Sequence, residues 1–305
     1  MSGSQTTLES QADFRSETLD PSLLHVRDLI YRVCGIYVAE KRLNFLQDRC
    51  NRRIQAMKTS ALSDYFKMLT AGRDRDAEIR NLLNEITIGD TCFFRGKPQL
   101  DALRKVVLPT IVAAKAKLSD KPVKLWSCGC STGEEPYTLA MLMLLEDAAG
   151  RLGGCTWEIH ATDLNDHALD KAKAGIYDAY ALRHTPALFK SKYFVGHSDK
   201  FMISEEVKCR VTFCRINLQD ESSLPLLDES SVIFCANVLI YFDETSKRRV
   251  VHNLFKNLAP GGYLFLGTSE SLYGVSDEFR LVHFPEAIGY LRPSDSLAGA
   301  SVERP

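Results

Sequence analysis

The chain has 305 residues, of which 45% are hydrophobic and 25% are charged. These values are typical of soluble globular proteins and exclude wholesale disorder, collagen-like repeats and coiled coils. The length suggests one large domain or two smaller ones. The formal net charge of −1 argues against nonspecific nucleic-acid binding, which depends on an excess of positive charge. We therefore expect no nucleic-acid partner.

The sequence lacks the patterns of membrane insertion and secretion. Its longest apolar run, Leu139–Leu145, has seven residues, far short of the ~20 that a membrane span needs. Residues 1–20 carry one basic and four acidic side chains and no apolar stretch, so we expect a polar tail and no secretory signal. Nine cysteines, an odd number, in a chain long enough to fold without disulfides indicate reduced thiols in the cytoplasm.

A zinc site is the alternative interpretation of the cysteines. Cys128 and Cys130 are separated by one residue, and Cys209 and Cys214 by four. Neither spacing is the Cys-x-x-Cys of structural zinc sites, and no paired histidine accompanies them. We therefore predict no metal site.

The first structured region is predicted to be a small all-α domain over residues 21–90. Apolar residues recur at helical spacing over 41–57, further helices fit 62–71 and 75–86, and no strand pattern precedes Ile86. The forty residues from Pro21 hold eight Lys and Arg against three acidic residues, a local charge of +5.

Three arginines of the 41–57 helix, Arg42, Arg49 and Arg53, lie within about 40° of one another at ~100° per residue. They border the apolar stripe. One interpretation is a solvated face whose long side chains cover the edge of the core. The other is a docking strip for an acidic helix, and the pattern alone leaves both open.

After Pro98 the pattern changes to alternating strands and helices. A helix over 100–117, kinked or divided at Pro109, precedes strands that are nearly all apolar, which predicts a mainly parallel sheet with helices on both faces. A closing hairpin adds antiparallel strands at one edge. The predicted strands are 123–128, 157–162, 211–215, 231–236, 263–267, 279–284 and 288–291, and the predicted helices are 135–147, 166–174 and 246–258, the last closed by a turn at 259–262.

Residues 175–208 interrupt this alternation. They hold six aromatic residues without a helical period, which predicts an insertion that forms a small β-subdomain. Insertions on a rigid sheet commonly carry substrate contacts.

The segment after the first predicted strand favours one kind of ligand. In open parallel sheets the ligand lies beyond the carboxyl ends of the strands, at the switch in strand order. Here Gly129 and Gly133 form Gly-x-x-x-Gly, not the three-glycine dinucleotide fingerprint, and Glu134 and Glu135 follow directly. A pyrophosphate would meet both carboxylates, so a nicotinamide or flavin dinucleotide is disfavoured. Carboxylates suit a ligand with a cationic end, although complementing the helix dipole also accounts for Glu135, and less well for Glu134.

Polar residues also end the next three strands, namely Asp163, Asn217 and Asn237. An acidic residue at the second strand matches the ribose-diol acceptor of nucleoside-binding folds. Either asparagine alone is compatible with an ordinary Asx turn. Taken together, the four strand ends favour a non-phosphorylated nucleoside with a charged tail, and S-adenosylmethionine fits that description.

Two further strings, 86–95 and 237–243, together with Cys128–Tyr137 and the Asp163 string, resemble the CheR family of chemotaxis-receptor glutamate O-methyltransferases. The resemblance runs in order from about Pro21 to Arg292. It implies an α/β fold: a Rossmann-like S-adenosylmethionine-dependent methyltransferase sheet with antiparallel edge strands, a small all-α N-terminal domain and a small inserted β-subdomain. The implied boundaries are a tail at 1–20, a receptor-recognition domain at 21–90, a linker lining the cofactor site at 91–99, a methyltransferase domain at 100–292 with its insertion at about 175–208, and a tail at 293–305.

Carried over residue by residue, the resemblance implies contacts to S-adenosylmethionine from Thr91, Arg95, Cys128, Gly129, Glu134, Asp163, Asn217, Leu218 and Asn237. It places Arg95 and Tyr241 beside the transferring methyl, and it implies that Arg42, Arg49 and Arg53 grip the acidic methylation helix of a receptor. Two residues depart from the family pattern. Gly89 stands where the family often has Asn, and Ala236 removes a cation near the site, so affinity and acceptor choice are expected to differ.

The implied reaction needs no general base. A glutamate carboxylate has a pKa near ~4.3 and is already ionised at neutral pH, so what remains is in-line positioning against the sulfonium methyl. The absence of His and Lys from the motifs agrees with a carboxyl acceptor. A non-catalytic S-adenosylmethionine-binding signalling module is the alternative, and a small-molecule methyltransferase is disfavoured because it would not need the basic helical domain.

The resemblance also implies how the protein is used. We expect a cytoplasmic monomer, recruited to membrane receptor arrays without inserting into the membrane, whose partners are the cytoplasmic methylation helices of chemoreceptors. The insertion at 175–208 is expected to dock the receptor or its C-terminal tail.

Overall fold

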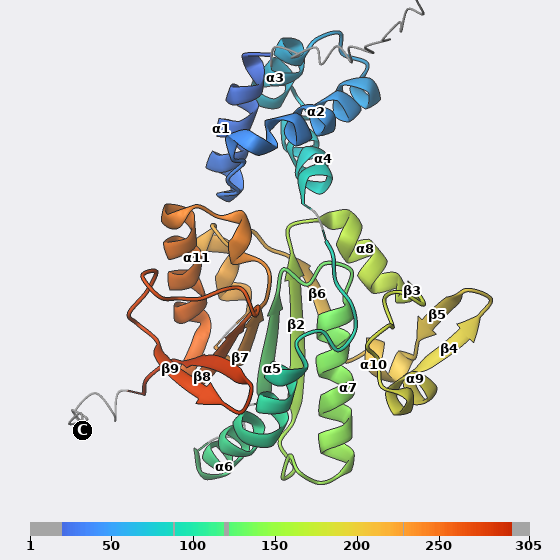
Figure 1. The fold of residues 1–305 in the computed structure, drawn as a ribbon, viewed down its shortest axis with the longest axis vertical. Coiled ribbons are helices and arrows are strands. Elements are labelled where there is room, and N and C mark those ends of the chain that lie inside the picture. Colours follow the sequence, from blue (N-terminus) through green and yellow to red (C-terminus); the bar gives the residue numbers. More distant parts are fainter. Residues whose placement is uncertain (1–19, 88, 119–121, 228, 295–305) are drawn as a thin grey trace, which may run out of the picture.

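The computed structural model describes residues 20–87, 89–118, 122–227 and 229–294. The predicted tails at 1–20 and 293–305 lie outside these residues except for Asp20, Pro293 and Ser294. Four helices form a bundle at one end of the molecule (Figure 1). They are α1 (Ser22–Cys34), α2 (Leu43–Met57), α3 (Leu62–Ala71) and α4 (Arg75–Ile86), with a short 3-10 turn, η1 (Glu40–Arg42), leading into α2.

The bundle has a core of its own, because its buried apolar side chains pack almost entirely with one another. In α2 the buried positions are Leu43, Leu46 and Cys50, the spacing that the sequence predicted for this helix. A buried ion pair joins three of the helices. The Glu78 carboxylate, 2% exposed, accepts two hydrogen bonds from Arg53, at 2.9 and 2.7 Å, and one from the Tyr65 hydroxyl at 2.7 Å.

The larger part of the chain forms a seven-stranded sheet in the order β6-β2-β1-β7-β8-β10-β9. The first five strands in this order are parallel, whereas β10 runs antiparallel to both β8 and β9. The predicted parallel sheet with an antiparallel edge is therefore confirmed. The strands are β1 (Val123–Cys128), β2 (Trp157–Asp163), β6 (Val211–Arg215), β7 (Ser230–Cys235), β8 (Leu258–Leu266), β9 (Arg280–Phe284) and β10 (Ala287–Leu291).

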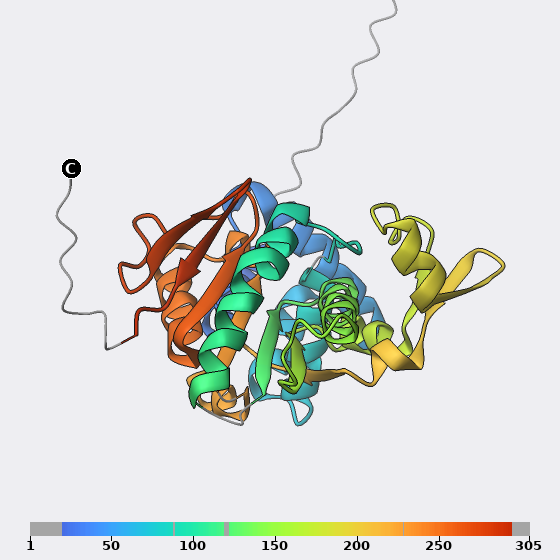
Figure 2. The same ribbon diagram turned by 90° about the horizontal axis from the view of Figure 1, so that it is seen from below.

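The two faces of the sheet are covered by different helices, since successive residues of a strand point to opposite faces. Leu125, Val232 and Phe234 belong to a core with α6 (Leu108–Leu118) and α7 (Glu134–Ala148). Their neighbours Trp126, Ile233 and Cys235 pack with α11 (Glu244–Asn257) on the other face. Figures 1 and 2 show this layered arrangement from two directions. The remaining helix of the sheet, α8 (Asp166–Ala174), follows β2.

Pro109 does not divide the helix in which it lies. The segment runs from α5 (Lys97–Ala102) through a π-helical turn, η2 (Leu103–Val107), directly into α6. In that turn the Leu108 N–H bonds to the Leu103 carbonyl, five residues back. The wider turn gives the proline ring room where an α-helical turn would clash, and proline has no N–H to satisfy.

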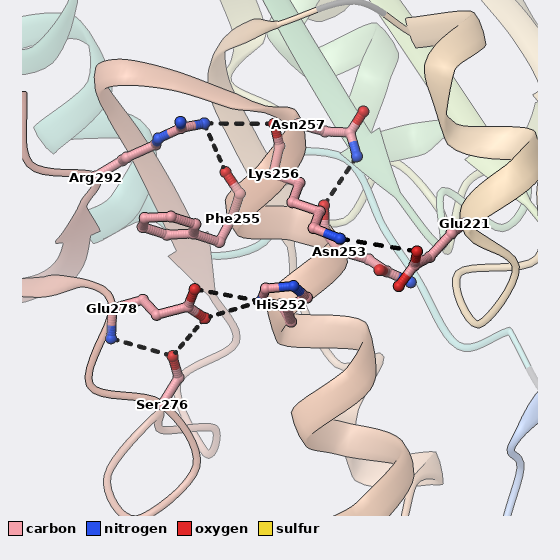
Figure 3. A network of polar contacts seen from close by, with 9 residues as sticks. All are labelled: Glu221, His252, Asn253, Phe255, Lys256, Asn257, Ser276, Glu278 and Arg292. Carbon is pink, nitrogen blue, oxygen red and sulfur yellow. Dashed lines mark hydrogen bonds and ion pairs between the residues drawn. The ribbon is translucent and has the colours of Figure 1, made fainter.

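The turn predicted at 259–262 is instead part of β8, which begins at Leu258 immediately after α11. A register shift between Ser230 and Val232 of the neighbouring strand accommodates the extra residues. Arg292 secures this junction. Its guanidinium lies over the Phe255 ring and donates to the carbonyls of Phe255 and Lys256 at the end of α11 (Figure 3), and it also donates to the carbonyl of Leu258. Side-chain donors of this kind satisfy carbonyls that a helix end leaves unpaired.

The predicted insertion is a β-subdomain, as expected, and it projects from the side of the sheet (Figures 1 and 2). It contains a three-stranded antiparallel sheet in the order β3-β5-β4 and two short helices that the sequence did not predict. The strands are β3 (Ile176–Asp178), β4 (Phe194–His197) and β5 (Lys200–Ile203), and the helices are α9 (Ala187–Tyr193) and α10 (Glu205–Lys208). Phe93 of the linker packs edge-on against Tyr177 and Phe194 of this subdomain.

Within the described part of the chain, no helix combines the length and the apolarity required to cross a membrane.

Candidate cofactor site

A cavity of about 410 Å³ opens at the carboxyl ends of the parallel strands. The loops that follow β1, β2, β6, β7 and β8 all contribute to its wall, because β1 lies between β2 and β7 and the strand order switches there. Cys34, Ile36 and Thr87 of the helical bundle complete the wall. Both parts of the molecule therefore enclose the same cavity.

Asp163, the last residue of β2, is held by the backbone. One carboxylate oxygen accepts from the Ser131 N–H and the other from the Asn165 N–H, each at 2.8 Å. Burial raises the pKa of this carboxyl, and the backbone N–H groups oppose that shift. Each oxygen keeps a further lone pair, so the carboxylate can still accept from a ligand diol.

The loop after β1 brings backbone close to the ligand space. Gly129 has a φ of 66°, and a Cβ there would lie 2.5 Å from Val238, so no other residue fits without displacement. Gly89 makes a similar close approach, because a Cβ at that position would meet the Ser131 hydroxyl oxygen at 2.1 Å. Ser131 lines this cavity, and its buried hydroxyl has no hydrogen-bond partner among the residues that the structure describes, so it is available to bond a ligand.

Of the two adjacent glutamates, Glu135 and not Glu134 lines the cavity. The Glu135 carboxylate accepts from the Ser127 hydroxyl at 2.7 Å. Burial raises the pKa of Glu135 to about 7, against the opposing effects of Ser127 and Arg95. Glu134, 4% exposed, instead accepts from the Thr132 hydroxyl at 2.7 Å at the start of α7. From the sequence, the cofactor contact was expected from Glu134, and Glu135 was the residue better explained by complementing the helix dipole.

The linker before α5 turns sharply around Arg95. Phe94 and Gly96 both have left-handed φ values, 57° and 71°, and the Phe94 N–H is fixed by the Thr138 hydroxyl at 3.1 Å. A left-handed non-glycine residue is strained and persists only where its surroundings hold it. The exposed Arg95 guanidinium donates to the Asp90 carbonyl at 2.6 Å and lines the cavity.

Tyr241 and Asn237 come from the segment after β7. Asn237 has a left-handed φ of 62°, and Tyr241 ends the short 3-10 helix η4 (Leu239–Tyr241). Burial raises the pKa of Tyr241, and the nearby positive charge of Arg42 opposes that shift. Arg42 of the bundle is therefore close enough to this edge of the cavity to act on it electrostatically.

Contacts between the bundle and the sheet hold the cavity closed on one side. Asn217 donates to the Val33 carbonyl at 2.7 Å, and Asn165 donates to the Asn84 carbonyl at 3.1 Å. A single β-bridge pairs Ile36 with Phe242. The side-chain amides of Asn217, after β6, and Asn165, after β2, therefore bind the helical bundle. Docking of the bundle accounts for these two polar residues as well as a ligand would.

Eight of the residues singled out from the sequence come together in the cavity wall: Thr91, Arg95, Gly129, Asp163, Asn217, Leu218, Asn237 and Tyr241. Cys128 and Glu134 do not line it. Arg53 does not form an open docking strip with Arg42 and Arg49, because its guanidinium is paired with buried Glu78. Because Arg53 lies on the edge of the apolar stripe of α2, its guanidinium can reach Glu78 of α4 inside the bundle.

Sequence reasoning missed three residues that line the cavity, namely Ser131 and the bundle residues Cys34 and Ile36. It also missed Glu270, which lines a neighbouring cavity. Glu270 follows β8 and accepts hydrogen bonds from the loops around the cavity. Polar residues that follow the ends of parallel strands mark such a site. Had this rule been applied to β8, the last parallel strand, it would have indicated Glu270.

This sheet order, with one carboxylate at the end of β2 and another facing the switch point, is typical of the class of S-adenosylmethionine-dependent methyltransferases. The residues present fit that cofactor. The cavity is within the usual size for a small-molecule site. Ser131, whose hydroxyl has no partner among the described residues, donates its N–H to Asp163, and Glu135 suits a cationic group.

Sequence comparison leads to the same class. Residues 89–288 match the CheR methyltransferase, SAM binding domain, and residues 22–87 match the CheR methyltransferase, all-alpha domain. The chain therefore belongs to the CheR methyltransferase family, and it contains that family's S-adenosylmethionine-binding domain.

Named relatives span most of the chain. Chemotaxis protein methyltransferase 2 of Vibrio cholerae serotype O1 is 32% identical over 90% of this chain and 93% of its own length. The chemotaxis protein methyltransferase of Vibrio anguillarum is 34% identical over 84% and 91%. Among solved structures, the N-methyltransferase NodS from Bradyrhizobium japonicum WM9, in complex with S-adenosyl-L-homocysteine, covers 61% of this chain and 86% of its own at 15% identity, with a TM-score of 0.33.

Proposed function

We propose that this methyltransferase transfers a methyl group to glutamate side chains on the cytoplasmic helices of chemoreceptors, forming glutamate methyl esters. The observation that carries the proposal is the chemistry of the cavity wall. Among its described residues the only cation is Arg95, and there is no His or Lys. A carboxylate acceptor needs no base, because it is ionised at neutral pH, and a lone cation beside it provides orientation.

The residues of the chain then have separable roles. Asp163 and the Ser131 hydroxyl bind the ribose, and Glu135 faces the cationic end of the cofactor. Arg95 orients the acceptor carboxylate, and Tyr241 borders the same space. When bound, S-adenosylmethionine supplies a methyl group on a positively charged sulfur. Because orientation alone can supply roughly 7–11 kcal/mol of a barrier, holding the carboxylate in line is the main task left to the protein.

The helical bundle is proposed as the surface that binds the receptor. Arg42 and Arg49 both stack on the ring of Phe45, at 5.0 and 4.6 Å from its centre. Contact with the same ring keeps both guanidinium groups near Phe45, and Arg42 lies close enough to the cavity to affect Tyr241. An acidic helix laid across this pair would reach the cavity with its glutamates.

The β-subdomain is proposed as a second contact for the receptor or its tail. Its exposed large apolar side chains support this role, since such clusters mark interaction sites: Ile176, Tyr180, Leu188, Val195 and Met202, each at least half exposed. Within the described subdomain, β3 and β4 are edge strands that pair on one side only, and such edges accept an extended segment as an added strand.

The experiment that tests the function is identification of the methyl acceptor. The purified chain is incubated with isotopically labelled S-adenosylmethionine and receptor-containing cytoplasmic membranes from its source. Mass spectrometry should find labelled methyl esters on glutamates of receptor helices, and mild base should release the label as methanol. Label on a small molecule, or on nitrogen, would refute the proposal. Cofactor binding with no transfer to any acceptor would favour the non-catalytic signalling module.

A further inference from the structure

Glu270 lies behind the loops that line the cofactor cavity, in a neighbouring cavity, and the catalytic scheme above does not use it. It belongs to the loop that follows β8, and it lies between that loop and the one that follows β7. One carboxylate oxygen accepts from the N–H of Asn237 at 2.7 Å and of Gly267 at 2.9 Å. The other accepts from Leu239 at 2.8 Å and Ile240 at 3.3 Å. A single side chain therefore receives four backbone N–H groups.

These four N–H groups lie where the β-ladder stops. The strands β7 and β8 pair up to Cys235 and Leu266, and beyond that point the two loops diverge to line the cavity. The space between them is small, since a Cβ on Gly267 would lie 2.8 Å from the Glu270 carboxylate and 2.9 Å from the Asn237 nitrogen. The carboxylate takes the place of the missing ladder and also caps the start of η4, whose first N–H groups have no partner within the helix.

Both residues that this arrangement fixes belong to the proposed site. Asn237 has a left-handed φ of 62°, which a non-glycine residue keeps only when its surroundings impose it. Tyr241 ends the 3-10 helix that the carboxylate caps. We infer that Glu270 is the positioning residue of the cofactor site: it holds the segment from Asn237 to Tyr241 in its binding conformation without touching the reacting atoms. This inference rests on the cofactor site described above.

The test compares S-adenosylhomocysteine binding by the full chain and by Glu270→Gln, using calorimetry. Glutamine keeps the shape, but it turns one acceptor into a donor that faces backbone N–H groups. Because hydrogen bonds to charged groups are among the stronger ones, we expect the Kd to rise about tenfold or more. Glu286→Gln is the matched control. It removes a carboxylate from the cavity beside the cofactor site, where Glu270 also lies, and it should leave the Kd within about threefold.

A second comparison separates positioning from general support of the fold. Glycine adopts left-handed φ without strain, so in an Asn237→Gly background Glu270→Gln should raise the Kd further by less than about threefold. An equal fold-change in both backgrounds would overturn the inference, and so would a Glu270→Gln protein that binds like the wild type. Should Glu270→Gln not fold, Glu270→Asp, which keeps the charge but shortens its reach, carries the same comparison. A wild-type chain that binds no S-adenosylhomocysteine would instead refute the cofactor site itself.

Discussion

At the scale of single residues, two of the carboxylates in the cavity wall, Asp163 and Glu135, are held in different ways. Asp163 has a backbone N–H on each oxygen, so its ionised form is stabilised at a fixed place. Glu135 has one hydroxyl donor, from Ser127, and burial raises its pKa to about 7. Asp163 is thus suited to bind neutral hydroxyls, whereas Glu135 gains most from a positive charge placed beside it.

The raised pKa of Glu135 predicts a pH-dependent affinity for S-adenosylmethionine. The ionised carboxylate attracts the sulfonium, and the fraction of protein in that form falls as the pH drops below the pKa of about 7. We therefore expect the Kd to rise by up to about tenfold per pH unit below that point. Calorimetry between about pH 5.5 and 7.5 measures this slope.

The neighbouring glutamate provides the control for that experiment. Glu135→Gln should bind more weakly at the upper end of the range and show a flat profile. Glu134→Gln should keep the slope, because Glu134 does not line the cavity. A slope that disappears in Glu134→Gln and persists in Glu135→Gln would return the role to the residue that family resemblance suggested.

Arg95 is expected to act on the methyl acceptor. Truncating it in Arg95→Ala should lower kcat at saturating cofactor by about 10²-fold, the scale of loss that misplacement of a reacting group causes. Arg95→Lys should recover only part of the rate, since an ammonium cannot hold a carboxylate in the two-point geometry of a guanidinium. Single-turnover methyl transfer gives these rates, and a full rate in Arg95→Ala would remove this role from Arg95.

At the scale of elements, the ion pair between Arg53 and Glu78 stabilises the helical bundle. Its carboxylate is 2% exposed, and its hydrogen bonds to Arg53, Tyr65 and Asn81 keep the pKa of Glu78 below its usual value even though burial acts to raise it. A folded-state pKa that is lowered gives stability that is present above the unfolded pKa near 4.5. That stability is lost as the pH falls through the folded pKa.

Arg53→Ala should therefore destabilise the protein by about 3–5 kcal/mol near neutral pH, because it leaves a buried carboxylate without its counterion. Urea unfolding followed by circular dichroism measures this free energy. The matched control is Arg52→Ala, one residue away. The Arg52 side chain is 61% exposed and pairs with partly exposed Glu85 at 3.5 Å, so its loss should cost less than about 1 kcal/mol. Similar losses in the two variants would contradict the buried-pair argument.

Arg42 and Arg49 are expected to affect receptor recognition without affecting the cofactor. Reversing both charges in an Arg42→Glu, Arg49→Glu variant should lower kcat/KM for the receptor by about tenfold or more, since like charges would then face the acidic helix. The Kd for S-adenosylhomocysteine should stay unchanged. Arg75→Glu, in an exposed pair on the next but one helix, is the control, and a parallel loss of cofactor binding would indicate misfolding instead.

At the scale of the whole molecule, the sequence predicted what local periodicity determines. The bundle helices, the parallel strands and the edge hairpin follow from spacing of apolar residues, so their order was predictable. The π-helical turn before Pro109 was not, because it depends on how one proline ring is accommodated. Nor was the inward turn of Arg53, which depends on Glu78 from another helix, or the four N–H groups gathered by Glu270. Those features arise from contacts between distant segments.

The enclosure of the cavity by both parts of the chain predicts that cofactor binding orders the junction between them. Ile36 lines the cavity and pairs with Phe242, and the Tyr37 N–H donates to the Tyr241 carbonyl at 2.9 Å. A ligand that contacts both walls adds free energy to the closed form only, so local opening at this junction becomes rarer. Amide hydrogen exchange at residues 34–37 should slow several-fold when S-adenosylhomocysteine is added.

The strands β4 and β5 supply the internal control for this experiment, since they lie in the β-subdomain and do not line the cavity. Their exchange should be unchanged. Tyr31→Phe, which removes the hydrogen bond from the Tyr31 hydroxyl to Asp243 at 2.9 Å, should weaken the junction by about 1 kcal/mol and reduce the protection. A wall that contacts the ligand cannot open as freely when the ligand is bound. If only the loops of the sheet were protected and residues 34–37 exchanged as before, the bundle would border the cavity without taking part in cofactor binding.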